Sequence, residues 1–339
     1  MNKYIIVTGG GTGGHLSVAK AFINELNTQG YKVIFIGSTK GQDKKWFENE
    51  PSLYKAFFLK TQGVVNQKLF GKIYSLWLIL KAVLKSIQII KKYKVSKVIS
   101  VGGFSAASAS FASIITKTDF YIHEQNSVMG KLNKLTSKYA KEVFSSYLDT
   151  SKVKDYPIRE EFFTKQRVRT NIKTIIFLGG SQGAKAINEY VIEVAPTLNN
   201  LGIKIIHQTG KDELKSIEEK YKTLNIDADV FDFSNNLIDK MQKADFAVSR
   251  SGASTLWELV ALGIPTLFIP YPYAASNHQY YNAKYLLDND LCFLKTQKEL
   301  YPKYLTTLLD NQHLNKISQN LIKTIHPNAV HNIIKIIMN

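Results

Sequence analysis

Two glycine-rich segments, one in each half of the 339-residue chain, constrain its fold more than any other feature. Each follows a short apolar run typical of a buried strand and precedes a segment of helical periodicity. Gly9–Gly14 follows Tyr4–Val7, and Gly179–Gly183 follows Thr174–Leu178. A strand, a tight glycine turn and a helix make up the first unit of a parallel α/β sheet. The sequence therefore predicts two Rossmann-like parallel-sheet domains facing a cleft.

Further apolar runs predict the other strands, at Lys32–Ile36, Lys97–Val101, Phe120–His123, Lys141–Phe144, Ile203–His207, Phe246–Ser249 and Thr266–Ile269. Strands that alternate with helices favour parallel sheets with right-handed crossovers. A polar stretch around Pro157 divides the chain, so we expect domains at residues 1–156 and 160–324. A last apolar segment, residues 325–339, has helical spacing. The pattern leaves open whether it packs back on the first domain.

The charge of the chain is strongly positive and unevenly distributed. Lys and Arg number 44 against 27 Asp and Glu, a net charge of +17, and no acidic residue lies between Glu50 and Asp119. A concentrated positive field attracts anionic surfaces. Nucleic acid is one candidate, but the sequence has no helix-turn-helix, zinc-finger or RNP-type signature. An anionic membrane is the other. The single cysteine, Cys292, excludes an intramolecular disulfide.

The acid-free stretch includes a segment of helical period, Phe70–Lys94. It is expected to carry lysines on one stripe and, on the opposite side, Ile73, Leu76, Trp77, Leu80, Leu84 and Ile87. Such a helix can lie in a membrane interface, with Lys72, Trp77, Lys81 and Lys85 at the membrane. The alternative is a packed helix with a solvated lysine face. The longest uncharged apolar stretch, between Lys72 and Lys81, is shorter than the ~18 residues of a transmembrane helix.

The first glycine segment has several possible functions. Gly9, Gly11 and Gly14 fit a GxGxxG dinucleotide fingerprint, but the second strand lacks the terminal acid that would hold an NAD ribose. Ser38 and Lys40 leave NADP open. The P-loop interpretation fails, because His15-Leu16 stands where Lys-Ser/Thr is required. Both motifs share exposed main-chain N–H groups at a helix N-terminus, which bind anionic groups.

Two polar clusters follow predicted strands, where open parallel sheets bind ligands. The first is His123-Glu124-Gln125-Asn126, and the second runs from Ser249 to Thr255 and continues to Glu258. A helix N-terminus in the second cluster could take a diphosphate, while Glu258 could accept hydrogen bonds from a ribose diol. The acidic pairs Asp227/Asp229 and Asp288/Asp290 fit turn and cap roles better than a metal site, so we expect no metal and no cofactor.

Taken together, GGGTGGH, HEQN, GGSQGA, HQTG and SRSGA followed by Glu258 resemble the MurG family of peptidoglycan N-acetylglucosaminyltransferases, from about residue 4 to about residue 285. The resemblance implies the GT-B architecture. It also implies inverting transfer of N-acetylglucosamine from UDP-GlcNAc to the C4 hydroxyl of undecaprenyl-diphospho-N-acetylmuramoyl-pentapeptide (lipid I), which forms lipid II. A peripheral location on the cytoplasmic side of the inner membrane follows from the same resemblance.

The resemblance also implies site residues. His15 is the candidate general base and Glu124 the reserve candidate, and the acceptor diphosphate is expected at Gly102, Gly103 and Ser105. The expected UDP-GlcNAc contacts are Thr12, Gly13, Gly14, Asn126, Arg159, Ser181, Ile238, Ala253, Ser254, Thr255, Leu256, Trp257, Glu258 and Gln279. Two segments depart from the family: Asp155-Tyr156 stands where Gly-Asn is common before Pro157, and Phe104 where Tyr is usual.

Three other functions remain open at this point. A UDP-GlcNAc 2-epimerase would share the architecture and the donor, but it needs no lipid acceptor. An NADP-dependent oxidoreductase would use only the first glycine segment. A basic module that binds nucleic acid would account for the charge alone. The partners we expect are UDP-GlcNAc, lipid I and an anionic membrane surface, without nucleic acid.

Overall fold

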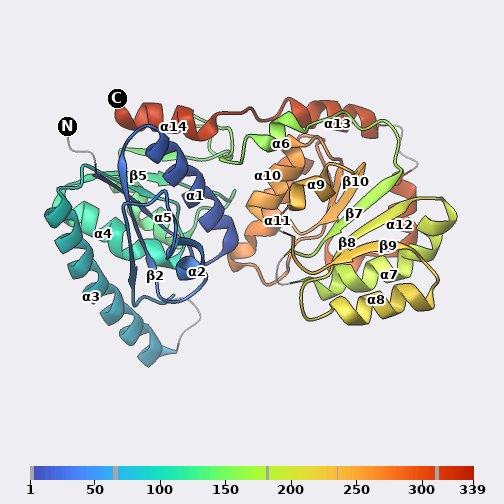
Figure 1. The fold of residues 1–339 in the computed structure, drawn as a ribbon, viewed down its shortest axis with the longest axis horizontal. Coiled ribbons are helices and arrows are strands. Elements are labelled where there is room, and N and C mark those ends of the chain that lie inside the picture. Colours follow the sequence, from blue (N-terminus) through green and yellow to red (C-terminus); the bar gives the residue numbers. More distant parts are fainter. Residues whose placement is uncertain (1–3, 64–67, 181–182, 235, 310–312) are drawn as a thin grey trace. The chain divides into compact units, whose positions relative to one another are not determined.

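The computed structural model describes residues 4–63, 68–180, 183–234, 236–309 and 313–339. The chain forms two compact units. The N-terminal unit comprises residues Met1–Ile158 and Asn328–Asn339, and the C-terminal unit comprises Arg159–Pro327. Each contains one six-stranded parallel sheet with helices on its faces (Figure 1). The predicted parallel α/β class is thereby confirmed.

The sheet of the N-terminal unit has the strand order β3-β2-β1-β4-β5-β6. Its strands are β1 (Tyr4–Thr8), β2 (Lys32–Ser38), β3 (Lys55–Leu59), β4 (Lys97–Ser100), β5 (Asp119–His123) and β6 (Glu142–Phe144). Its helices are α1 (Gly13–Thr28), α2 (Asp43–Phe47), α3 (Leu69–Tyr93), α4 (Ala107–Thr116), α5 (Lys131–Thr136) and α14 (Ala329–Met338). The strand runs are rich in β-branched residues, which suit a sheet covered on both faces.

The sheet of the C-terminal unit repeats this topology, in the order β12-β11-β10-β7-β8-β9. Its strands are β7 (Thr174–Leu178), β8 (Lys204–Gln208), β9 (Ala228–Phe231), β10 (Phe246–Ser249), β11 (Thr266–Phe268) and β12 (Phe293–Leu294). Its helices are α6 (Glu161–Thr164), α7 (Lys185–Asn200), α8 (Leu214–Thr223), α9 (Leu237–Met241), α10 (Ala253–Ala261), α11 (His278–Leu287), α12 (Pro302–Leu309) and α13 (Leu314–Ile322).

The strand order reverses direction once in each sheet, and this position locates the functional loops. In the N-terminal unit the reversal lies between β1 and β4, paired through Thr8 and Ser100. In the C-terminal unit it lies between β7 and β10, paired through Leu178 and Ser249. Ligands of open parallel sheets bind outside the carboxyl ends of the strands at such a switch point. All the glycine-rich segments follow these four strands.

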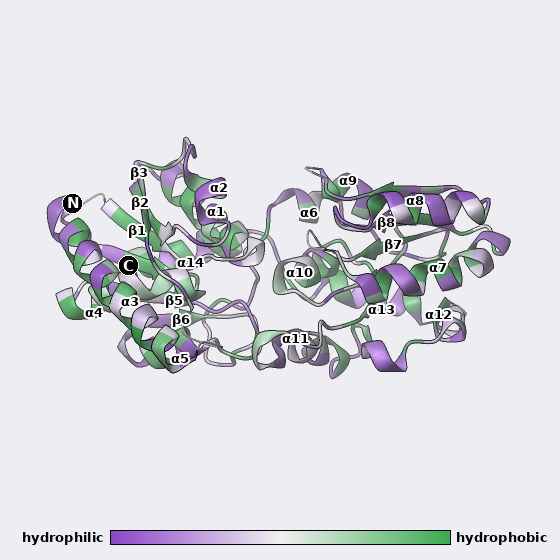
Figure 2. Ribbon diagram, turned by 90° about the horizontal axis from the view of Figure 1, so that it is seen from below, coloured by the Kyte–Doolittle hydropathy of each residue, from purple (hydrophilic) through white to green (hydrophobic). Residues whose placement is uncertain are grey.

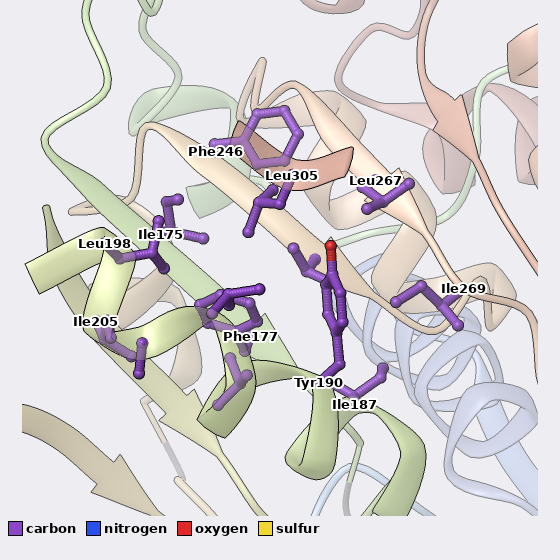
Figure 3. Close-up of a cluster of buried hydrophobic side chains, with 14 of the residues drawn as sticks. Ile175, Phe177, Ile187, Tyr190, Leu198, Ile205, Phe246, Leu267, Ile269 and Leu305 are labelled. Atoms are coloured by element: carbon purple, nitrogen blue, oxygen red, sulfur yellow. The ribbon is translucent and has the colours of Figure 1, made fainter. Parts of the chain in front are cut away.

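Each unit is held together by its own apolar core. In the C-terminal unit, Ile175 and Phe177 of β7 pack with Tyr190 of α7, Phe246 of β10 and Leu305 of α12 (Figure 3). The sheet and the two helices therefore share one cluster from which water is excluded, and burial of these side chains supplies most of the stabilising free energy. This core fixes the carboxyl ends of β7 and β10 relative to each other.

The last helix, α14, belongs to the N-terminal unit, a question that the pattern left open. Its His331 Nδ1 lies 2.9 Å from Glu25 Oε1 of α1, and the carbonyl oxygen of Ile337 accepts a hydrogen bond of 3.4 Å from Tyr121 of β5. Ile333, Ile334 and Ile337 are fully buried. The helix thus uses its apolar face to cover the first unit.

Three strands escaped the sequence analysis. Strand β3 is a partly exposed edge strand, β12 has two residues, and β9 lies at the opposite edge of its sheet from β12. Edge strands are less buried than central strands, so their runs of apolar residues are short or interrupted by charged residues. Lys55 and Asp229 occupy such positions in β3 and β9.

Candidate active site

The two glycine loops of the N-terminal unit meet at the switch point. The N–H of Gly10 donates a hydrogen bond of 3.1 Å to the carbonyl of Gly102. A Cβ atom on Gly103, whose φ is +79°, would lie 2.2 Å from the carbonyl oxygen of Gly10, and one on Gly9 would lie 2.5 Å from that of Gly102. These glycines are therefore required for contact between the loops. Gly102 and Gly103 can reach an acceptor only through their main chain.

A buried carboxylate that sequence reasoning did not assign holds this arrangement. Asp43, fully buried at the start of α2, accepts 2.6 Å and 2.8 Å hydrogen bonds from the N–H groups of Gly11 and Ser38. The only signal in the sequence was that Asp43 is the first acid after the second strand. Because both carboxylate oxygens are engaged with main chain, this acid is not available to a dinucleotide ribose, which disfavours the NAD interpretation further.

The N-terminus of α1 presents the predicted residues Thr12, Gly13, Gly14 and His15. Thr12 is the N-cap residue, and its Oγ1 lies 2.9 Å from His15 Nδ1 instead of capping the helix. The nearest atom to a Cβ on Gly13 would be Gln42 Oε1, at 3.9 Å, an ordinary van der Waals distance, so a ligand can approach Gly13 closely. Main-chain N–H groups at a helix N-terminus suit an oxygen-rich ligand.

Glu124, the reserve base, has a carboxylate already occupied by hydrogen bonds. It is 3% exposed, and it accepts 2.9 Å bonds from the N–H groups of Asn126 and Gly130 and a 2.8 Å bond from Asn133 Nδ2. A base needs a lone pair directed at the substrate. The geometry therefore favours a positioning role for Glu124, which shapes the loop that carries Asn126.

His123 and Ser105 are also buried. Burial, together with the charge of the nearby His15, lowers the pKa of His123 to about 3, so His123 is neutral at physiological pH. The Ser105 side chain is fully buried, and its hydroxyl has no hydrogen-bond partner among the described residues. The structure therefore leaves no appreciable surface of Ser105 exposed for the expected contact with the acceptor diphosphate.

In the C-terminal unit, α10 begins at the switch point behind Gly252. Gly252 is the N-cap residue with φ of −63°, and a Cβ atom there would have nothing within 4 Å. The fold itself does not require glycine at this position. The side chains of Ala253, Leu256 and Trp257 are buried, so these predicted contact residues can offer only main-chain groups, whereas Ser254 and Thr255 are half-buried.

Glu258 lies in the second turn of the same helix in a desolvated environment. Its residue is half-buried, yet the surrounding protein disfavours the ionised carboxylate and raises its pKa to about 7, while the positive charge of Arg159 opposes that rise. Arg159 lies at the start of this unit, forms an ion pair with Glu161 and stands 5.2 Å from the ring centroid of Phe162. The structure thus brings two predicted residues, 99 positions apart, into electrostatic contact.

The segment that follows β11 is tied to the loop that precedes α10. Arg250 Nη1 donates 2.9 Å and 3.0 Å hydrogen bonds to the carbonyls of Ile269 and Pro270. Gln279, a predicted sugar contact, accepts a 2.9 Å bond at Oε1 from the N–H of Tyr271, and its carbonyl accepts one of 2.8 Å from Ser251 Oγ. Arg250 is therefore a positioning residue that sequence reasoning did not assign.

The remaining predicted donor contacts lie around β7 and α9. Ser181 lies outside the described residues. Gly180, with φ of +78°, has nothing within 4 Å of a Cβ position. Ile238 of α9, the expected uracil contact, is fully buried. His207, from the HQTG segment, is a buried structural residue whose ring lies 3.1 Å from Tyr221 Oη and 3.0 Å from Asn188 Oδ1.

The acidic pairs considered for metal binding have other contacts. Asp229 forms an ion pair of 2.6 Å with Lys240, and Asp288 forms one of 2.7 Å with Lys284. Within residues 4–339, apart from the segments that the structure does not describe, no three His, Cys, Asp or Glu side chains gather as a metal site would require. The geometry offers main-chain N–H groups, rather than carboxylates, to an anionic ligand.

Comparison with known proteins decides the family. Residues 5–145 match the glycosyltransferase family 28 N-terminal domain, and residues 174–335 match its C-terminal domain. The chain is 48% identical over 335 residues to a UDP-N-acetylglucosamine--N-acetylmuramyl-(pentapeptide) pyrophosphoryl-undecaprenol N-acetylglucosamine transferase of a Sulfurovum species, covering 99% of this chain and 98% of the relative. It is 47% identical to the Helicobacter pylori protein of the same name, covering 98% and 99%. The chain belongs to the MurG family.

A solved MurG structure agrees with this assignment. The crystal structure of Acinetobacter baumannii MurG superposes with a TM-score of 0.81 at 27% identity, and the match covers 99% of both chains. The chain is therefore an N-acetylglucosaminyltransferase of the MurG family with a GT-B fold. The family relation removes the oxidoreductase as an explanation of the first glycine-rich segment and the nucleic-acid module as an explanation of the charge.

In this member of the MurG family, helix α3 exposes an apolar side of the kind that water-soluble proteins usually bury. Ser75, Leu78, Ala82 and Val83 are buried, whereas the side chains between 47% and 86% exposed are those of Phe70, Ile73, Tyr74, Leu76, Trp77, Leu80 and Leu84. The ribbon of α3 carries both hydrophobic and hydrophilic residues along its length (Figure 2). Ile87, which we expected in the same apolar stripe, is half-buried and thus less exposed than the others. The exposed apolar stripe contradicts the alternative of an ordinary packed helix with a purely lysine-bearing outer face.

Two expectations for this helix were wrong. The lysines are adjacent to the apolar stripe and not opposite it, because Lys81 Nζ lies 3.5 Å from the ring centroid of Trp77. In addition, Phe70–Tyr93 is long and apolar enough to cross a membrane by length and composition. The sequence estimate had counted only the uncharged stretch between Lys72 and Lys81. Since the face with Leu78 and Ala82 packs on the protein, length alone does not make α3 a spanning helix.

Proposed function

We propose that the chain transfers N-acetylglucosamine from UDP-GlcNAc to lipid I and so forms lipid II, in line with the names of its MurG relatives. The observation that carries the donor site is the N-terminus of α10. There, Gly252 leaves open space in front of the first-turn N–H groups, and Glu258 lies in the next turn. The diphosphate binds those N–H groups, and Glu258 accepts hydrogen bonds from the ribose hydroxyls.

This arrangement supports the departure of UDP without routing a step through a metal. Negative charge develops on the leaving diphosphate in the transition state, and fixed N–H donors directed at that charge lower the barrier. The open space at Gly252 lets the phosphate approach the helix. Arg159, whose positive charge acts on Glu258 in the same unit, favours the ionised carboxylate that the ribose needs.

The N-terminal unit supplies the base in this proposal. In the tautomer that donates from His15 Nδ1 to Thr12 Oγ1, His15 Nε2 carries the lone pair that accepts the proton of the attacking C4 hydroxyl. Attack from the face opposite to UDP inverts the anomeric carbon. The acceptor diphosphate binds main-chain groups of Gly102 and Gly103.

The experiment that tests this reaction uses radiolabelled UDP-GlcNAc with purified lipid I, followed by chromatography of the lipid fraction. We expect label in the lipid fraction and no change in UDP-GlcNAc incubated alone. A UDP-GlcNAc 2-epimerase, the second candidate, needs no acceptor. It would convert the nucleotide sugar by itself and leave the lipid unlabelled, which would refute the transfer.

The membrane location is part of the same proposal. The exposed apolar stripe of α3 lies in the acyl–headgroup boundary and the neighbouring Lys72, Lys81 and Lys85 lie toward anionic headgroups, which makes the protein peripheral at the cytoplasmic face of the inner membrane. Each such lysine adds ~1 kcal/mol of attraction at low salt.

Co-sedimentation with anionic liposomes tests this location. We expect binding that weakens in high salt and that falls at least about fivefold in Leu80→Ser, since a buried leucine side chain contributes ~1.5–3 kcal/mol. Leu135→Ser is the matched control, because Leu135 on α5 is 56% exposed against 58% for Leu80. Equal binding of the wild type and both variants would contradict a membrane role for α3.

A further inference from the structure

A cavity lined by lysines lies beside the C-terminal half of α3. It has a volume of about 240 Å³, and it lies between α3 and β3, the edge strand of its sheet. Lys55 and Phe57 of β3 form one side, and Lys85, Gln88, Lys92 and Tyr93 of α3 form the other. Neither the donor site nor the acceptor loops use any of these side chains.

The charge of this cavity is not compensated. All three lysines are exposed, no acidic residue lies between Glu50 and Asp119, and across the described residues no carboxylate forms an ion pair with Lys55, Lys85 or Lys92. The three ammonium groups around this hollow repel one another, and an anion that enters it reduces that repulsion. The Gln88 amide adds an uncharged hydrogen-bond donor. An anion with several oxygens, such as a phosphate, can accept hydrogen bonds from all of them.

Away from the ammonium groups of the lysines, the walls of the cavity are apolar. The rings of Phe57 and Tyr93 lie 6.3 Å apart between centroids. Lys55 Nζ lies 5.4 Å from the centroid of Phe57, and Lys92 Nζ lies 5.5 Å from that of Tyr93. Cation–π contacts of this length favour ammonium groups near the rings. The cavity therefore suits a ligand that has both a phosphate and hydrocarbon, as a phospholipid has.

The cavity follows directly after the exposed apolar stripe of α3. The stripe ends at Leu84, and the first cavity residue of α3 is Lys85. With a rise of 1.5 Å per residue, the cavity residues from Lys85 to Tyr93 extend over roughly 12 Å from the end of the stripe. When the stripe lies in the acyl–headgroup boundary, these lysines are therefore next to the headgroup phosphates.

We propose that this cavity is a specific site for the phosphate of an anionic membrane phospholipid. The inference rests on the proposed membrane association of α3, and it adds a defined headgroup site to a general attraction. Binding of one phosphate by three lysines from two elements fixes the rotation of α3 on the bilayer surface, which diffuse attraction does not.

A pair of charge-matched double variants of the full chain tests the proposal. Lys55→Gln/Lys92→Gln removes one cavity lysine from β3 and one from α3. Lys60→Gln/Lys91→Gln removes two exposed lysines beside them, one directly after β3 and one on α3, that do not line the cavity. Binding is measured to vesicles of a neutral glycolipid, which has no phosphate, that contain either phosphatidylglycerol or a fatty acid, at equal zeta potential.

We expect the cavity variant to lose at least about tenfold in partition coefficient on phosphatidylglycerol, and the control variant no more than about threefold. On fatty-acid vesicles, which offer carboxylates, the two variants lose equally. Equal losses on both surfaces would show general electrostatics and overturn the site. Unchanged thermal unfolding of both variants confirms that they are folded.

A soluble source of the same chemistry is tested by titrating the wild-type chain with inorganic phosphate at fixed ionic strength. Competition with phosphatidylglycerol vesicles only at high excess supports a lipid site. If binding of inorganic phosphate saturates at low concentration and the two double variants bind vesicles equally, the cavity binds a free anion and the proposal is overturned. Failure of the lipid I assay would refute the transfer but not the headgroup site, and the reverse result would refute only the site.

Discussion

Replacement of Glu258 by Gln tests whether the carboxylate at the donor site is held at a cost in stability. Its pKa is about 7 in the folded protein, against 4.5 for an unperturbed glutamate. One pKa unit corresponds to 1.36 kcal/mol, so the ionised form is disfavoured by about 3 kcal/mol on folding. The desolvated position of the carboxylate beside α10 is the physical cause.

The sign of the pH dependence follows from proton binding. Between pH 4.5 and about 7 the folded state binds more protons at Glu258 than the unfolded state does, so the free energy of unfolding falls as the pH rises through this window. Glu258→Gln has no such proton. Relative to wild type, we expect it to be more stable by about 3 kcal/mol at pH 8 and by about 1 kcal/mol at pH 5.

Urea unfolding followed by tryptophan fluorescence measures this difference. Trp257 lies beside Glu258, and replacement of Trp46 and Trp77 by Phe leaves it as the single reporter, located in the C-terminal unit. A gain of about 3 kcal/mol corresponds to a midpoint shift of roughly 1 M urea or more. Glu161→Gln is the control, because it removes a partly exposed carboxylate that pairs with Arg159 and should change stability by less than about 1 kcal/mol.

Function should move in the opposite direction. If ribose hydroxyls donate to the ionised carboxylate, Glu258→Gln weakens UDP-GlcNAc binding by about tenfold or more at pH 8, and wild-type affinity falls as the pH drops below 7. A stability difference that stays constant from pH 5 to pH 8, or a variant less stable at pH 8, would refute the reasoning.

Four further substitutions separate packing from chemistry. Gly103→Ala should destabilise the N-terminal unit by about 3 kcal/mol or more, seen in thermal unfolding, since its Cβ would meet the carbonyl of Gly10 at 2.2 Å. Gly252→Ala should lower the free energy of unfolding by at most about 1 kcal/mol but raise KM for UDP-GlcNAc. An unchanged KM would show that the diphosphate does not bind at this helix. His15→Ala should lower kcat by ~10²–10⁴, and near-normal turnover would exclude it as the base. Asp43→Asn should cost about 2–4 kcal/mol, seen in urea unfolding, because an amide would place a donor against an N–H.

The parallel α/β class and most central strands were predictable from the sequence. The strands predicted at Thr174–Leu178 and Phe246–Ser249 have the same bounds in the structure. Burial on both faces of a sheet demands an unbroken apolar run, and that demand is local. The strand Lys55–Leu59 was missed because it lies at the edge of the sheet, where a strand does not need an unbroken apolar run. The motifs indicated the family without any knowledge of contacts.

Long-range contacts were decided only by the tertiary structure. The sequence marked Glu124 as a polar residue after a strand, but its engagement by Asn133 and Gly130 depends on how a later loop returns to it. Asp43 reaches Gly11 across 32 positions, and Arg159 reaches Glu258 across 99. The exposed side of α3 likewise depended on which face α4 covers. Periodicity along a chain reports which residues share a face, while the identity of the neighbour on that face is set by the path of the whole backbone.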